Sequence, residues 1–236
     1  MNLISDINNA LMQLWATQLP AGAPQLVPMQ YAESPKAPIV FVGLNPSFSE
    51  DGWSRNQRLA KQLPVNAREF FAWPRHKSFT VAECLTLEGY AHAHYAFFKW
   101  HRDIAKASKL PWTHYDIFAI RETSQQTVQS LTCSGADPLG LTPFGAAQLA
   151  IFHDLLALAT PRAVVVVNAL AAQIYLQQRR PRFDPATGHY WDTTPGGQTF
   201  PVFLSGMLTG ARAVDRHPRT RLIWQVLHAL GVSWQP

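Results

Sequence analysis

A carboxamide stands directly after the first strongly apolar segment of the chain. Ile39–Val42 is a short apolar run that is typical of a buried strand, and Gly43 ends it. Asn45 follows, and because Pro46 holds the preceding residue in an extended conformation, Asn45 cannot begin a helix. Polar side chains at the carboxyl ends of buried strands form the sites of open α/β sheets. The loop therefore predicts a binding site whose first polar group is the Asn45 carboxamide.

Other polar groups follow the remaining predicted strands, which we place at 115–120, 163–167 and 199–204. Parallel strands direct their carboxyl ends to one side of a sheet, so these groups should gather with Asn45 in one crevice. Such a crevice suits a polar planar ligand or a phosphate. The glycines of 206–210 can present backbone donors to an anion, although taken alone they favour an ordinary turn between a strand and a loop. The groups are Arg121 with Glu122, Asn168, and the segment 205–209.

Helical periodicity separates these strands and defines the class of fold. Apolar residues recur at helical spacing in five segments, which are 3–19, 91–108, 142–159, 169–178 and 218–231. Strands that alternate with helices predict a mostly parallel sheet between helical layers. We expect one domain over residues 1–236, with its core within 38–231. The long segments 48–90 and 181–198, the second with a hairpin near residue 187, are the expected functional loops.

Composition limits the class of protein and its partners. The chain has 236 residues, of which 47% are hydrophobic and 15% charged, as in ordinary globular proteins. A net charge of +5 and a pI near 9.4 suit an acidic partner such as nucleic acid. The apolar runs are too short to span a membrane, and the first residues lack the pattern of a signal peptide. We therefore expect a cytoplasmic monomer.

Cysteine usage argues against a metal centre. Cys84 and Cys133 are the two cysteines of the chain, too few to hold an iron–sulfur cluster or a structural zinc by themselves. They can form one disulfide or remain free thiols, and a cytosolic location favours free thiols. We expect no metal, no iron–sulfur cluster and no other cofactor.

Several motifs resemble those of the uracil-DNA glycosylase superfamily. Gly43-Leu44-Asn45-Pro46 is similar to its first motif, Gly-x-Asp/Asn-Pro, which follows the first core strand. The segment 164–176 resembles its strand-then-helix unit, and 216–222 resembles the start of its C-terminal helix. The resemblance covers about 38–231. It implies a three-layer α/β/α sandwich with a central, mainly parallel four-stranded sheet.

The resemblance also implies a reaction, in which a flipped base enters a pocket at the sheet edge and its N-glycosidic bond is hydrolysed. Asn45 matches the residue that positions the water. An aromatic side chain would stack on the base, and Phe48, Phe71 and Trp73 are the candidates, with Trp73 preferred. Each of the three can instead be a core residue.

Two departures from the family concern the leaving base. Where the family has a base-reading asparagine after its second strand, this chain has Arg121 and Glu122, which can read a base or hold the loop. The last strand is not followed by the histidine that stabilises the leaving base, so either His217 reaches back or this group is absent.

The remaining candidates bind the base or the DNA backbone. Asn168, which stands where the family more often has glycine, is a candidate for base binding. Phosphate contacts are assigned to Ser205, Gly206, Thr209, Arg212, Arg216 and Arg219.

Three functions follow from these residues. The first is recognition of DNA or a nucleobase with excision of the base, so that the chain is a candidate DNA glycosylase. The second is a non-catalytic module of the same fold that binds nucleic acid or a nucleotide. The third is a different hydrolase or transferase that acts on a small phosphorylated ligand.

Overall fold

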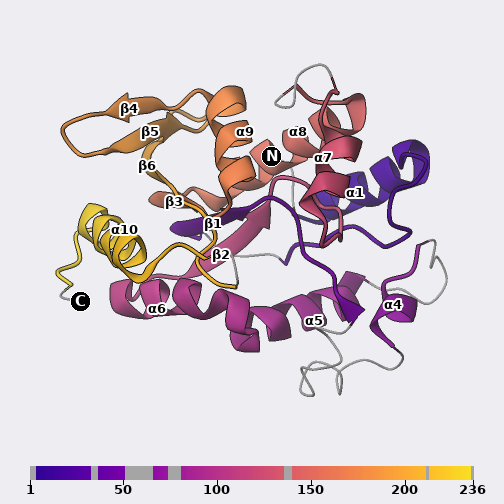
Figure 1. Cartoon of the computed structure of the whole chain (residues 1–236), viewed down its shortest axis with the longest axis horizontal. Coiled ribbons are helices and arrows are strands. Elements are labelled where there is room, and N and C mark those ends of the chain that lie inside the picture. The colour runs from indigo at the N-terminus through magenta and orange to yellow at the C-terminus, as the bar shows by residue number, and fades with distance from the viewer. Residues whose placement is uncertain are drawn as a thin grey trace. The chain divides into compact units, whose positions relative to one another are not determined.

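Short runs of β-branched and aromatic residues form the strands of a six-stranded sheet (Figure 1). The computed structural model describes residues 4–32, 37–50, 66–73, 81–135, 140–210 and 213–234. The strands in this part of the chain are β1 (Ile39–Gly43), β2 (Trp112–Asp116), β3 (Ala163–Val166), β4 (Arg182–Asp184), β5 (His189–Thr193) and β6 (Thr199–Leu204).

The sheet has the strand order β2-β1-β3-β6-β5-β4. Strand β3 pairs in parallel with β1 and β6, in a register that sets Val40 beside Val164 and Val164 beside Val202. Strand β5 is antiparallel to both of its neighbours, β4 and β6. The mixed α/β class is as predicted, but the expected number of four strands is too low. The hairpin near residue 187 adds β4 and β5, because its alternating residues extend the edge of the sheet.

The predicted second strand is displaced along the sequence. It was expected at 115–120, whereas β2 spans Trp112–Asp116. The residues after Asp116 stay buried, but their backbone bonds lie outside the sheet: the Ala119 N–H donates to Gln148 Oε1 at 2.8 Å, and the Ala119 carbonyl accepts from the Met29 N–H at 2.9 Å. An apolar run therefore continued beyond the strand itself, and hydrophobicity alone could not locate the end of the strand.

Four of the five predicted helices occur close to their expected bounds, at Ile4–Gln18, Pro143–Ala159, Ala169–Arg179 and Arg216–Ala229, whereas the helix at Gln125–Thr132 was not predicted. The helices of the described residues are α1 (Ile4–Gln18), α4 (Ala67–Phe70), α5 (Val81–His94), α6 (Lys99–Ser108), α7 (Gln125–Thr132), α8 (Pro143–Ala159), α9 (Ala169–Arg179) and α10 (Arg216–Ala229), with a 3-10 turn, η1, at Ala96–Phe98. As predicted, Thr142 caps α8: its hydroxyl accepts from the Gly145 N–H at 3.1 Å. The single helix expected at 91–108 is divided, because Tyr95 is extended between α5 and η1. None of the helices within the described ranges is long and apolar enough to cross a membrane.

The chain divides into two compact units. The first comprises Met1–Glu33, Asn45–His94 and Asp116–Phe152, and the second comprises Ser34–Leu44, Tyr95–Tyr115 and His153–Pro236. Apart from Asp116, the last residue of β2, the sheet belongs to the second unit.

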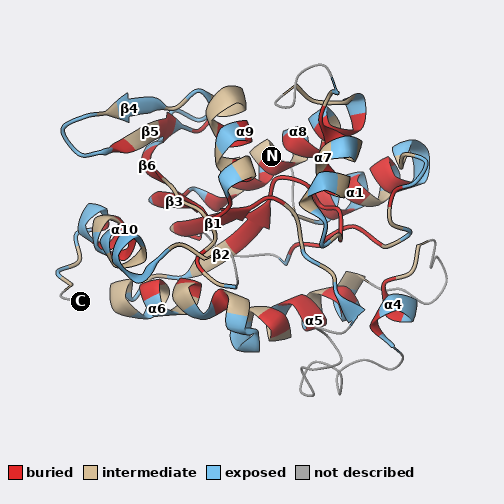
Figure 2. Cartoon of the chain, in the orientation of Figure 1, coloured by how far each residue is buried: buried red, intermediate tan, exposed pale blue. Residues whose placement is uncertain are grey.

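The sheet of the second unit is covered on both faces. Val165 and Val167 belong to a core cluster that also contains Ile104 of α6 and Val226 of α10. Figure 1 shows α6 and α10 on this side of the sheet and α9 on the other, and Figure 2 shows β1 and β3 buried throughout. Two-sided burial explains why β3 is apolar at every position.

The first unit has its own small core. Its members are Val27, Phe70, Phe71, Cys84 and Leu87, with Phe48 and Trp73 packed at the margin. Two of them, Cys84 and Leu87, come from one face of α5, so this helix carries the residues next to the candidate site described below.

Candidate functional site in the first unit

Asn45 is fixed at the point where the chain leaves β1. Its amide nitrogen donates to the Glu122 carbonyl at 2.6 Å, to the Ile120 carbonyl at 3.1 Å and to the Pro46 carbonyl at 3.3 Å. These bonds set the orientation of the carboxamide, because an amide turned by half a rotation would place oxygen against carbonyl oxygen. The predicted meeting of Asn45 with Glu122 is therefore observed, and it occurs through the backbone of Glu122.

Two further contacts join the loops that begin at Asn45 and Ile120. The Glu122 N–H donates to the Pro46 carbonyl at 3.1 Å, and the Thr123 hydroxyl donates a short bond to the Phe48 carbonyl. The Glu122 carboxylate accepts from the Ser124 N–H at 2.8 Å, just before the start of α7. The two loops thus form one hydrogen-bonded frame that holds the side chains between them.

A groove of about 880 Å³ lies against this frame. That volume is within the range of small-molecule sites. Arg121 and Glu122 line it from one loop, and Phe48 from the other. The rest of the lining consists of Ala23, Pro24, Gln25, Leu26, Ser49, Glu50, Arg68, Ala72, Trp73 and Thr123. Four of the predicted site residues therefore meet at one groove: Phe48, Trp73, Arg121 and Glu122.

The guanidinium of Arg121 is the most deeply buried charge at the groove, with 4% of the residue exposed. Its Nη2 donates a short bond to Glu88 Oε1, and it lies 3.6 Å from Cys84 Sγ and 3.7 Å from Met29 Sδ. The buried Nε has no hydrogen-bond partner. Arg121 is thus paired on one side only, which is unusual for a buried polar group.

Burial and the ion pair set the protonation states here. Burial acts to lower the pKa of Arg121, but Glu88 and Cys84 outweigh it and raise that pKa above its ordinary value. Burial raises the pKa of the Cys84 thiol to about 12, although Arg121 opposes the shift. Cys84 is therefore a neutral thiol at pH 7 and not a nucleophile, since the thiolate is the reactive form.

The three aromatic candidates have different environments. Phe71 is fully buried, and the Arg121 guanidinium lies 4.2 Å from its ring centroid, so one face of the ring is already covered. Phe48 meets the edge of Phe71 with ring centroids 5.8 Å apart and is only partly buried. Trp73 is also partly buried and lines the groove. Phe71 is thus a core residue, while Phe48 and Trp73 have surface that a ligand can contact.

The remaining predicted residues belong to the second unit. Asn168 caps α9, with its Oδ1 accepting from Leu170 N at 3.0 Å and from Ala171 N at 3.1 Å. The Thr209 hydroxyl donates to the Phe97 carbonyl at 3.4 Å, at the turn that also contains Ser205 and Gly206. Each of these side chains is bonded to a backbone group of the second unit, so its hydrogen bond has a structural role.

The basic residues near α10 also divide into structural and exposed groups. Arg219 donates to the Leu208 carbonyl at 3.4 Å and lies 4.4 Å from the centroid of the Trp100 ring. Arg216 and His217 are exposed in the first turn of α10. Arg212 lies outside the described residues. Of the described residues in this set, Arg216 and His217 are the exposed ones.

Sequence reasoning missed Glu88, although a signal was present. Cys84, Leu87 and Ala91 mark one apolar face of α5, and Glu88 is an acidic residue on the same face. A carboxylate on an apolar face requires a partner, and Arg121, an arginine directly after an apolar run, requires one as well. The two residues could have been paired on that basis.

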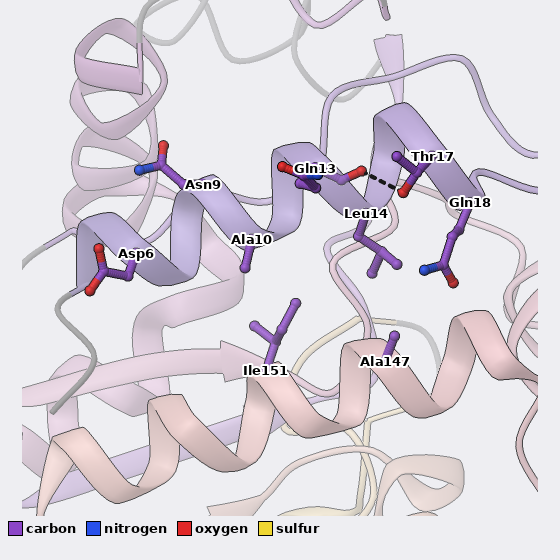
Figure 3. A pocket seen from close by; sticks show the side chains of 9 residues that line it. All are labelled: Asp6, Asn9, Ala10, Gln13, Leu14, Thr17, Gln18, Ala147 and Ile151. Atoms are coloured by element: carbon purple, nitrogen blue, oxygen red, sulfur yellow. Dashed lines mark hydrogen bonds between the residues drawn. The ribbon is translucent and has the colours of Figure 1, made fainter.

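A second hollow of the first unit, of about 520 Å³, lies between α1 and α8 (Figure 3). Leu14 of α1 and Ile151 of α8 point into it, and amide side chains such as Asn9 and Gln13 stand at its margin. Asp6 is its one titratable lining residue, so it carries little chemistry. In the described ranges, no group of three or more His, Cys, Asp or Glu side chains could hold a metal ion.

The groove beside Arg121 is therefore the candidate site, on the basis of its own geometry. No family model matches the chain, and no curated protein matches it either.

Proposed function

We propose that the groove of the first unit binds a nucleobase and that the chain hydrolyses the N-glycosidic bond of that base in DNA. The observation that carries the proposal is the fixed carboxamide of Asn45. Its nitrogen is bound to carbonyl oxygens, so its oxygen is the atom left to accept a hydrogen bond from a water molecule. The resemblance of Gly43-Leu44-Asn45-Pro46 to the first motif of the uracil-DNA glycosylases supports this role.

Asn45 does not line the groove itself but is bonded to the backbone of Glu122, which does, and the groove supplies the other requirements of base binding. Its volume of about 880 Å³ accommodates a base together with part of its sugar. Phe48 or Trp73 can stack on the base, a contact that every base offers through its ring face. Arg121 lies at the same groove, where its guanidinium can donate to the edge of the base.

The chemistry available to Asn45 is limited to positioning. An amide does not take a proton at neutral pH, so Asn45 orients the water and does not activate it as a general base. Positioning still lowers the barrier, because a correctly placed water reacts as part of the complex. We therefore expect slow turnover, in which departure of the base carries most of the barrier.

A specific observation favours the second candidate function, a binding module without catalysis. The nitrogen of Asn45 bonds to backbone carbonyls of two loops, and holding these loops together is sufficient reason for an asparagine at this position. In that case the groove binds its base, and no bond is broken.

Oligonucleotides that carry a single uracil, hypoxanthine, xanthine or mismatch, in single- and double-stranded form, test the proposal. Alkali converts each abasic site that the protein produces into a strand break. Asn45→Ala should abolish cleavage, whereas Ser47→Ala, a change at an exposed residue of the same loop, should retain it. Urea unfolding of both variants shows whether the loss has a structural origin.

The outcomes separate the candidates. Cleavage that is lost in folded Asn45→Ala supports hydrolysis with Asn45 at the water. Cleavage that persists in this variant refutes the assignment of Asn45. Base-dependent binding without any cleavage supports the binding module, and neither binding nor cleavage rejects a nucleobase ligand.

The DNA backbone contacts are tested separately, in the second unit. Arg216 and Arg221 are exposed on α10, a helix that contains no acidic residue. If both contact phosphates, Arg216→Gln with Arg221→Gln should reduce the slope of log affinity against log salt by roughly 1–2. An unchanged slope would exclude α10 from the contact with DNA.

A further inference from the structure

The hydrogen-bonding capacity of Arg121 is only partly used. A guanidinium has five N–H donors and no acceptor. The known contacts of Arg121 with Glu88, Cys84 and Met29 all involve Nη2. Nε lacks a partner, and Nη1 donates to none of the described residues. Arg121 lines the groove, and because a guanidinium only donates, a ligand that meets it there should present hydrogen-bond acceptors.

The charge of the surroundings favours a neutral acceptor. Glu88 compensates the charge of Arg121 through the buried ion pair, and the nearby Cys84 is a neutral thiol. The buried cluster thus has no net charge. The other charged residues at the groove are the paired Glu50 and Arg68 and the carboxylate of Glu122, so the groove provides little attraction for a phosphate beyond its hydrogen bonds. A neutral base edge gains the same hydrogen bonds with a smaller loss of hydration.

The bases differ in whether they present adjacent acceptors. A 6-oxopurine such as guanine or hypoxanthine presents O6 and N7 side by side, and these are the atoms that arginine binds most often in DNA recognition. Adenine replaces O6 with an amino donor. Uracil has a single acceptor, O4, on the edge that corresponds to that of thymine, and its N3–H donor lies between O4 and O2. A donor facing Arg121 would be repelled.

We infer that the groove selects a 6-oxopurine, namely hypoxanthine, xanthine or guanine, over uracil, with Arg121 as the residue that determines specificity. This inference rests on the proposed function, because it assumes that the ligand of the groove is a base. An amide at this position would both donate and accept, whereas the guanidinium of Arg121 only donates.

Fluorescence anisotropy with labelled single-stranded oligonucleotides that differ only at one central base provides the test. The central nucleotide carries hypoxanthine, uracil, adenine or thymine on a 2′-fluoro sugar, which blocks hydrolysis during the measurement. We expect the wild-type protein to bind the hypoxanthine strand on the order of tenfold to a hundredfold more tightly than the uracil strand, which is the discrimination of one bidentate arginine contact.

A double variant tests whether Arg121 is the cause. Arg121→Gln with Glu88→Gln removes both charges together and places an amide, which can donate to O4 and accept from N3–H, at the groove. The hypoxanthine preference should fall at least tenfold in this variant. The matched control is Lys99→Gln with Asp103→Asn, which removes an exposed ion pair of α6 and should leave the preference unchanged.

Each outcome has a separate meaning. The inference is overturned if the wild-type protein prefers the uracil strand. It is also overturned if the protein binds the hypoxanthine and uracil strands equally, but both more tightly than the thymine strand. In either case the proposed function still stands. Equal affinity for all four strands rejects the proposed function and the inference with it. A preference for hypoxanthine that survives in the folded Gln–Gln variant overturns the role of Arg121, and if this variant does not fold, the wild-type comparison decides.

Discussion

Replacing Glu88 with glutamine should destabilise the chain far more than the same change at the surface. Glu88→Gln keeps the shape of the side chain and an acceptor oxygen but removes the charge that compensates Arg121. The guanidinium then remains buried without a counter-charge. A matched control is Glu50→Gln, which removes the charge from the ion pair of Glu50 with Arg68.

The exposure of the two pairs sets the expected magnitudes. The side chains of Arg121 and Glu88 are 3% and 12% exposed, so the cost of losing one partner is that of a buried ion pair, about 3–5 kcal/mol. The remaining acceptor oxygen of glutamine and the slight exposure of Glu88 place the expectation near the lower value, about 3 kcal/mol. Arg68 and Glu50 are 74% and 51% exposed, so the control should cost less than about 1 kcal/mol.

Urea unfolding of four proteins gives the coupling of the buried pair. These are the wild type, Glu88→Gln, Arg121→Gln and the double variant, and each midpoint is converted to a free energy of unfolding. Each single variant leaves one buried charge alone, whereas the double variant leaves none, so the double variant should lose about 1–3 kcal/mol less than the sum of the single losses. If Glu88→Gln costs no more than Glu50→Gln, and the single losses add within about 0.5 kcal/mol, the buried ion pair does not exist in solution.

Three further predictions concern the same unit. Asn45→Asp should lose about 2–4 kcal/mol at pH 7, because a carboxylate replaces the donor that faces three carbonyls; urea midpoints should recover part of the loss below about pH 4, where the acid is protonated. Gly145→Ala would place a methyl group against the Thr132 carbonyl and should cost about 1–3 kcal/mol. Gly89→Ala, in the middle of α5 with open space around it, should instead stabilise the chain by about 0.5–1 kcal/mol. Thermal unfolding that ranks the two variants in the opposite order would contradict this packing. Cys84 should not react with a thiol reagent at pH 8 until the chain is unfolded, because its raised pKa keeps it protonated.

The elements of the fold were predictable wherever periodicity and end signals agreed. Thr142 and Pro143 mark the start of α8, and the apolar run from Ala163 to Val166 marks a strand that is covered on both faces. The short hairpin at residues 182–193 was recognised from its turn, but its pairing with β6, the next strand along the chain, was not. The end of β2 was missed because burial continues through Ile120 in a segment bonded outside the sheet.

The site was less predictable than the fold, and the reason is physical. The position of Asn45 follows from local sequence, since a glycine and a proline surround it at the end of a strand. The environment of Arg121 depends on Glu88, which lies 33 residues away on α5, and no local rule specifies that distance. Trp73 and Phe71 are neighbours in sequence, yet one is at the groove and the other in the core. Both residues are aromatic, so residue type alone does not show which one faces the groove. The direction of the backbone around Ala72 determines it.

The buried ion pair is itself an argument for recognition at the groove. Apolar residues of similar volume would serve the stability of the first unit at least as well as Arg121 and Glu88, because burying two charges removes their hydration. The pair differs from an apolar pair in one useful respect, which is that it presents fixed donors while its own two charges compensate each other. The loop bonds made by Asn45 and Thr123 hold the segment that carries Arg121, so those donors stay in place before a ligand arrives. Preorganised donors of this kind discriminate between ligands by the hydrogen-bond acceptors that each ligand offers. Changes at Arg121 should therefore alter which base the protein prefers more than how tightly it binds bases in general.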